Sequence, residues 1–161
     1  MSNRREAGKT PALAMRTRRA TAADIPAVMA VERHAATAAH WPMEQYETAF
    51  RGEAPSRTVL VIEDEASVLG FITGRALGEE WEIENIAVAE PARRHGLGAR
   101  LLGEFLDLAR DQGAATVFLE VRESNLAARR FYAKWAFKES GRRKLYYHEP
   151  EEDAIVYRFE I

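Results

Sequence analysis

The chain has 161 residues, which suits a single domain, and its 47% hydrophobic and 30% charged residues allow both a buried core and a soluble surface. A net charge of -2 excludes a bulk electrostatic attraction to nucleic acid or anionic membranes. The absence of cysteine excludes disulfides, thiolate nucleophiles and cysteine-ligated zinc, and it fits a reducing compartment. We therefore expect a cytoplasmic protein with no direct nucleic-acid or membrane partner.

Residues 1–13 are predicted to form a disordered N-terminal tail. Arg4, Arg5 and Lys9 lie in this stretch, but the apolar segment that a signal peptide needs does not follow them. The folded domain is therefore predicted to span residues 14–161. No apolar run within it approaches the length of a membrane span.

The first part of the domain is predicted to combine short helices with an antiparallel strand pair. A strand at 15–20 precedes Thr21, which is predicted to cap a helix ending near His34. A short helix is predicted at 43–50. A β-branched run at 58–62 and a second run at 67–75 flank the turn Asp64-Glu65 and are predicted to pair.

The strand predicted at 81–88 changes phase in its middle. Trp81 and Ile83 occupy odd positions, whereas Ile86 and Val88 occupy even ones. Strict alternation cannot keep both pairs on one face, but one extra residue near Glu84-Asn85 would do so. This favours a β-bulge over the alternative, a strand that is buried on both faces.

The second part alternates strands and helices. A helix is predicted at 96–110, a short strand at 116–121 and a helix that opens at Asn125. Two closing antiparallel strands are predicted at 137–147 and 154–161. This order predicts an α/β fold, with a mixed sheet of six to seven strands, some parallel pairing and flanking helices.

The segment between the bulged strand and the helix at 96–110 is typical of a phosphate-binding loop. Glycines allow close approach of the backbone, and free N–H groups at a helix start attract anions. A dinucleotide fingerprint would need a third glycine where Leu101 stands, and a P-loop would need Gly-Lys-Ser/Thr. The pattern Arg-x-x-Gly-x-Gly therefore favours a pyrophosphate without bound magnesium. The alternative is a tight turn with solvated arginines.

Glu120 lies inside the apolar strand Val117-Phe118-Leu119-Glu120-Val121. A buried carboxylate is costly to keep charged, and desolvation would raise its pKa, which suits a general base. Alternatively, Glu120 pairs with an arginine across the sheet or points to water at an edge. The position alone leaves both interpretations open.

Tyr132 and Asn125 have simple structural interpretations. Tyr132 falls on the apolar stripe of its helix with Ala128, Phe131 and Trp135, and such an aromatic is more often core than catalytic. Asn125 is first of all an N-cap. The four histidines lack metal-ligand spacing, and no Gly-x-Ser-x-Gly elbow is present, so neither a metal site nor a serine hydrolase is expected.

These motifs together resemble the GNAT acetyltransferases. The likeness rests on Asn85-Ile86-Ala87-Val88, Arg93-Arg94-His95-Gly96-Leu97-Gly98, Leu119-Glu120-Val121-Arg122, Asn125 and Phe131-Tyr132. Within the family, Arg142-Arg143-x-x-Tyr146-Tyr147 and Glu152-Asp153-Ala154-Ile155 resemble the RimI type, which acetylates the N-terminal alanine of a small-subunit ribosomal protein. The segment His40-Trp41-Pro42 departs from the usual Pro-Trp order, and Arg93 stands where glutamine is common.

The resemblance implies acetyl-CoA as co-substrate, a protein N-terminus as partner, and a monomer or weak dimer. Glu120 would be the general base, and Tyr132 the general acid that protonates the leaving thiolate. The residues that would bind the coenzyme are Ile86, Ala87, Val88, Arg93, Arg94, His95, Gly96, Leu97, Gly98, Ala99 and Asn125.

Two other functions fit the same family likeness. One is acetylation of a small-molecule amine or antibiotic. The other is a non-catalytic acyl-CoA sensor, against which the presence of both Glu120 and Tyr132 argues.

Overall fold

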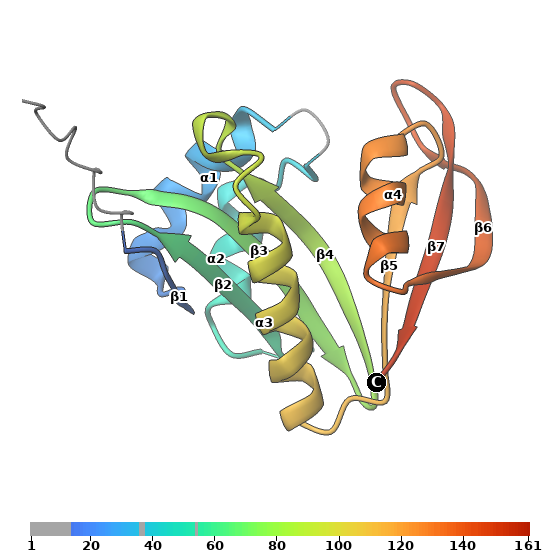
Figure 1. Ribbon diagram of the computed structural model, residues 1–161, viewed down its shortest axis with the longest axis horizontal. Helices are drawn as coiled ribbons and strands as arrows, with labels where there is room; N and C mark the ends of the chain where they lie inside the picture. The colour runs from blue at the N-terminus through green and yellow to red at the C-terminus, as the bar shows by residue number, and fades with distance from the viewer. Residues whose placement is uncertain (1–13, 36–37, 54) are drawn as a thin grey trace, which may run out of the picture.

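The computed structural model describes residues 14–35, 38–53 and 55–161, and the tail predicted at residues 1–13 lies outside them. The described residues form a seven-stranded sheet flanked by four α-helices (Figure 1). The first half contains β1 (Arg16–Arg19), α1 (Ile25–Arg33), α2 (Met43–Ala49), β2 (Arg57–Glu63), β3 (Val68–Leu77) and β4 (Glu80–Val88). The second half contains α3 (Leu97–Asp111), β5 (Thr116–Arg122), α4 (Leu126–Lys134), β6 (Lys138–Tyr147) and β7 (Glu152–Glu160). Two 3-10 turns, Ala22–Asp24 and Glu90–Ala92, precede α1 and α3.

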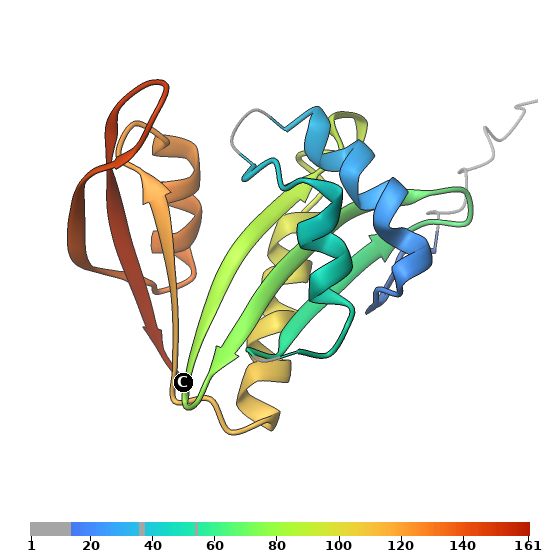
Figure 2. The same ribbon diagram turned by 180° about the vertical axis from the view of Figure 1, so that it is seen from behind.

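The strands are ordered β1-β2-β3-β4-β5-β7-β6, and β4 with β5 is the parallel pair. All other neighbours in the sheet are antiparallel. This arrangement confirms the predicted α/β class with a mixed sheet. Helices α3 and α4 cover one face of the sheet, and α1 and α2 cover the other face of its first half (Figures 1 and 2).

Two hydrophobic clusters fill the space between these layers. The larger lies under α3 and α4 and includes Leu101, Phe105, Val117 and Leu119, all at most 2% exposed. The smaller lies under α1 and α2 around the fully buried Tyr46 and Phe71. Because the sheet separates the two clusters, a side chain on β4 or β5 belongs to one layer or the other according to its position along the strand.

The bulge predicted in β4 is present. Thr73 of β3 lies opposite Asn85, whereas the next residue, Gly74, lies opposite Ile83, so Glu84 is the extra residue. Trp81 and Ile83 before the bulge therefore share the α3 layer with Ile86 and Val88 after it. The single extra residue Glu84 thus restores the alternation that keeps the apolar side chains of β4 on one face.

The bulge depends on a glycine in the neighbouring strand. A Cβ at Gly74 would lie 2.2 Å from Cζ of Phe105 and 2.6 Å from the carbonyl oxygen of Glu82. The ring of Phe105 therefore packs directly on the β3 backbone beside the bulge, and only glycine leaves room for it.

The predicted helix after Thr21 begins as the turn Ala22–Asp24, and α1 starts at Ile25. Pro26 accounts for the difference, because it has no N–H to complete an α-helical bond at this position. Thr21 and Asp24 still form the reciprocal capping box of a helix start.

Strands β4 and β5 pair over a short length only. The three pairs are Glu80 with Thr116, Trp81 with Val117 and Glu82 with Phe118. Beyond these pairs the two strands diverge, which gives the sheet a V shape in both views (Figures 1 and 2). Because the strands are parallel, α3 and α4 both begin at the open end of the V.

Candidate active site

The part of β4 that lies beyond the last pair with β5 has a free side. The N–H of Ala89 bonds to the carbonyl of Leu69 on β3 at 2.7 Å. By antiparallel alternation the backbone of Ala87 also points to β3, whereas that of Ile86 and Val88 points toward the opening. Of the three predicted residues, Ile86 and Val88 thus offer backbone groups there, although Arg93 Nε already donates to the Val88 carbonyl at 2.9 Å.

The predicted phosphate loop turns sharply into α3. Arg94 and Gly96 adopt left-handed backbone angles, with φ of 66° and 74°. Arg100 donates its N–H to the Gly96 carbonyl at 3.0 Å, so the N–H groups of Leu97, Gly98 and Ala99 precede the first bond of the helix. Arg94 and His95 are exposed, whereas the side chain of Leu97 is part of the core.

Gly98 lies where β4, α3 and α4 meet. A Cβ at this position would have its nearest contacts at 3.9 Å, to Phe131 of α4 and Val88 of β4. Its φ is not positive, so neither the backbone nor the neighbours require glycine here. A glycine with no structural reason at a helix start suits close approach by a phosphate group.

Glu120 points away from the core that contains its neighbours Leu119 and Val121. Its side chain is 10% exposed, and Arg143 Nε on β6 lies 2.6 Å from Oε1. The arginine pairing considered from the sequence is therefore present, with a residue two strands away in the sheet. Burial and then the Glu120 carboxylate raise the pKa of Tyr146, so this phenol also faces Glu120.

Two more carboxylates, not predicted as site residues, lie on the same face of the sheet. Glu82 accepts from Arg75 Nε at 2.6 Å, and burial raises its pKa. Glu84, in the bulge, accepts from Nε and a terminal nitrogen of Arg57 at 3.0 and 3.2 Å. Their alternation with Trp81 and Ile83 is the sequence signal that would have found them.

Tyr132 approaches from the opposite face. It is 4% exposed and packs against Phe131, Phe137 and Tyr157, with ring centroids 5.2, 5.5 and 6.4 Å away. Burial raises its pKa, so the phenol keeps its proton and can act as a donor at neutral pH. Glu120 and Tyr132 therefore flank β5 from its two sides rather than facing each other.

Asn125 performs the predicted cap. Its side-chain oxygen accepts the N–H of Ala128 at 3.2 Å. The cap places the start of α4 at the open end of the V, and Phe131 further along the same helix approaches Gly98 of the phosphate loop. Its amide nitrogen is not used by the cap.

The segment His40-Trp41-Pro42 is tied to a buried carboxylate. Glu32 of α1 accepts the N–H of Trp41 and the hydroxyl of Tyr46, and burial raises its pKa. The N–H of Ala39 donates to Oδ1 of Asn85 on β4 at 3.2 Å. The Glu32 bonds hold Trp41 and α2 to α1, and the Ala39 bond joins this connection to the strand that carries the bulge.

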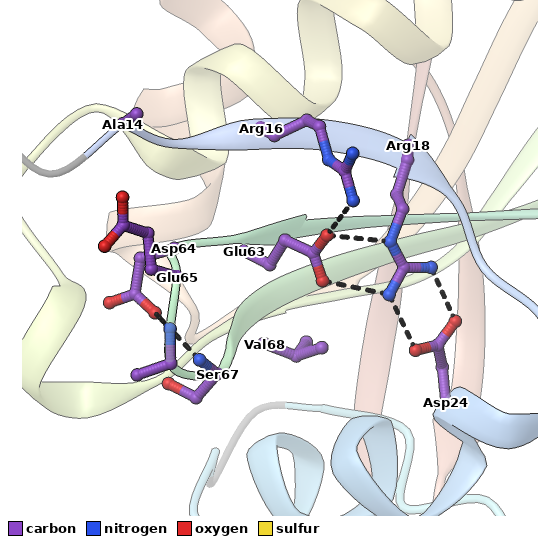
Figure 3. Close-up of a pocket in the computed structure, with 10 residues that line it drawn as sticks. Ala14, Arg16, Arg18, Asp24, Glu63, Asp64, Glu65, Ser67 and Val68 are labelled. Atoms are coloured by element: carbon purple, nitrogen blue, oxygen red, sulfur yellow. Dashed lines mark hydrogen bonds and ion pairs between the residues drawn. The ribbon is translucent and has the colours of Figure 1, made fainter.

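Two cavities of about 560 and 590 Å³ lie elsewhere in the described structure. The first surrounds an ion-pair network in which Arg18 bridges Asp24 and Glu63 (Figure 3). The second lies between α1 and the turn after β4. Neither is lined by Glu120, Tyr132 or the phosphate loop. Within the described ranges, no helix is long and apolar enough to cross a bilayer, and no three potential ligands gather as a metal site would need.

Comparison with known proteins defines the family. Residues 26–137 match the model of the acetyltransferase (GNAT) family. The chain therefore belongs to the GNAT family of acetyltransferases.

Similar proteins within the family include enzymes named for the protein that they acetylate. The [ribosomal protein bS18]-alanine N-acetyltransferase of Salmonella typhimurium is 32% identical over 135 residues, which are 83% of this chain and 88% of that one. The crystal structure of the Escherichia coli ribosomal-protein-S18-alanine N-acetyltransferase superposes with a TM-score of 0.80 at 27% identity, covering 92% of this chain and 94% of that chain. The structure of Ard1 from Thermoplasma volcanium reaches a TM-score of 0.83 at 31% identity, with coverage of 92% and 99%.

Proposed function

We propose that this acetyltransferase moves an acetyl group from acetyl-CoA to the N-terminal amine of a protein, and that its acceptor is the N-terminal alanine of a small-subunit ribosomal protein. The observation that carries the proposal is the separation of β4 from β5, with Glu120 beside its vertex and the phosphate loop at its open end. The name and coverage of the Salmonella typhimurium relative support the acceptor.

The residues around the opening fit the coenzyme. The free N–H groups of Leu97, Gly98 and Ala99, with the positive end of the α3 dipole, suit a pyrophosphate. Arg94 and Arg100 add positive charge. The backbone groups of Ile86 and Val88 that face the opening, apart from the Val88 carbonyl already bonded to Arg93, suit the amide groups of a pantetheine arm, as an unpaired strand edge does for a peptide.

Acetyl-CoA supplies a thioester carbonyl that a neutral amine can attack. In our proposal, Glu120 takes the proton of the incoming ammonium, directly or through water. An N–H of Ile86 or Val88 polarises the carbonyl. Tyr132, kept protonated by its burial, donates its proton to the departing thiolate from the other face of the sheet.

The roles of Glu120 and Tyr132 are separated by pH–rate profiles. Glu120→Gln should be partly rescued at high pH, where more of the acceptor is already neutral. Tyr132→Phe should lower kcat without rescue and with little change in coenzyme affinity. Each defect should reach roughly 100- to 10,000-fold. A folded Tyr132→Phe variant with the wild-type rate throughout would make Tyr132 a core aromatic only.

The acceptor is tested with peptides. We expect transfer to a peptide beginning Ala-Arg and none once its α-amino group is blocked. Equal acetylation of an α-blocked peptide that contains lysine would contradict the assignment to protein N-termini. Faster transfer to small polyamines than to any peptide would favour a small-molecule acceptor instead.

A further inference from the structure

Three carboxylates and three guanidinium groups meet where β4 and β5 part. Each carboxylate is paired with an arginine from a different strand. The pairs are Glu82 with Arg75 at 2.6 Å, Glu84 with Arg57 at 3.0 Å and with Arg75 at 3.3 Å, and Glu120 with Arg143 at 2.6 Å. The formal charges of this cluster cancel, so it has no free anionic site for another cation.

The three arginines are not equally held. The side chains of Arg57 and Arg75 are 17% and 32% exposed. Arg57 donates twice to Glu84 and lies 5.7 Å from the ring centroid of Trp41, and Arg75 contacts two carboxylates. Arg143 lies at the same 5.7 Å from the ring centroid of Tyr146, but it is 57% exposed and contacts Glu120 as its one carboxylate in the described structure. Because Arg143 is the most exposed of the three arginines and contacts a single carboxylate, it is the member that exchanges most easily.

The sheet leaves space for Arg143 to move. Glu120 lies opposite Val156 of β7, and Val156 lies opposite Gly141 of β6. Arg143, two residues after Gly141, lies opposite the small side chain of Ala154. A Cβ at Gly141 would meet no atom within 4 Å. The Arg143 side chain thus reaches Glu120 across an open surface. The β6–β7 register is irregular between Arg143 and the next pair, Tyr147 with Glu152.

We propose that the Arg143 guanidinium occupies the place of the acceptor ammonium over Glu120, and that the ammonium replaces it when the acceptor binds. This inference rests on the proposed function, in which Glu120 receives the proton of the acceptor. A fourth cation added to the balanced cluster would bring uncompensated charge into a largely buried site, whereas exchange keeps the balance. Arg143 thereby selects a charged amine, because an amide or an acylated amine has no charge with which to displace it.

The test measures binding of a peptide beginning Ala-Arg to the full chain loaded with coenzyme A, by calorimetry. Arg143→Gln should tighten the peptide Kd about two- to fivefold, which is the range expected for an ion pair whose arginine is open to solvent. Arg143→Ala repeats the test without a new polar group. The matched control is Arg16→Gln, which removes an exposed arginine of β1, at the opposite edge of the sheet, from its pair with Glu63 of β2 and should leave Kd unchanged (Figure 3).

An unchanged or weaker Kd in both Arg143 variants would overturn the proposal, since Arg143 would then be a bystander or a direct contact to the acceptor. In a Glu120→Gln background, loss of Arg143 should no longer tighten binding, because the contested carboxylate is gone. The rate of Glu120→Gln separates the two failures. A wild-type kcat in Glu120→Gln would reject Glu120 as the base, and with it the proposed function of this residue. An inactive Glu120→Gln variant, together with an unaltered peptide Kd in Arg143→Gln, would reject only the exchange of Arg143 for the acceptor ammonium.

Discussion

Gly98 provides the sharpest test of the phosphate loop, because replacing it should move stability and coenzyme affinity in opposite directions. The nearest contacts of an added Cβ are at 3.9 Å, so Gly98→Ala fits the fold. Replacing glycine at a compatible helical position stabilises a protein by about 0.4–1 kcal/mol, which corresponds to a rise in Tm of roughly 1–4 °C for a domain of this size. The same methyl group would intrude where we propose that the pyrophosphate binds.

Gly98→Asp adds a charge to this intrusion. A carboxylate about 5 Å from one phosphate charge costs about 3 kcal/mol at an effective dielectric constant of 20. Gly98 is half-buried, so solvent screening reduces this value, and we expect at least a tenfold loss of affinity. Calorimetric titration with acetyl-CoA measures the loss, and thermal unfolding confirms that both variants fold. A folded Gly98→Asp variant with the wild-type Kd would refute the placement of the pyrophosphate at this loop.

Two further predictions concern stability. The Arg18 guanidinium lowers the pKa of Asp24 from 3.8 and that of Glu63 from 4.5, both to about 2 (Figure 3). The two carboxylates therefore stabilise the fold fully at a pH above their pKa values in the unfolded chain, and this stabilisation is lost as the pH falls toward 2. Arg18→Met should flatten this part of the curve of Tm against pH. An unaltered curve would contradict the ion-pair network. Gly74→Ala should cost about 1–3 kcal/mol in urea unfolding, because its Cβ overlaps a core ring and a backbone carbonyl. Gly141→Ala is the control, and equal stabilities of the two variants would disprove the close packing at the bulge.

Features encoded by neighbouring residues were predictable from the sequence. The bulge followed from the phase of Trp81 and Ile83 against Ile86 and Val88, and the register of β3 with β4 confirms it. The Asn125 cap followed from a helix-start residue before an apolar stripe. Both depend on only a few consecutive positions, where alternation or helical periodicity is directly visible.

Contacts between distant strands were not predictable in this way. An arginine partner for Glu120 was one alternative from the sequence, but Arg143 is identified only by the order β5-β7-β6 and the length of its side chain. The approach of Glu120 and Tyr132 from opposite faces also depends on how α4 packs on the sheet. Periodicity fixes which residues share a face of one element, but it does not fix which elements meet.

The short parallel seam between β4 and β5 also bears on folding, and we expect it to form after the antiparallel pairs on either side of it. Strands β2, β3 and β4 follow one another directly and form a meander with short turns, whereas β1 joins β2 through α1 and α2, and β5 joins β4 through α3. The seam thus joins a unit of four strands to a unit of three, and the opening between β4 and β5 exists only once these units dock. A substitution that weakens the seam alone should abolish transfer while the backbone amides within each unit stay protected from hydrogen exchange.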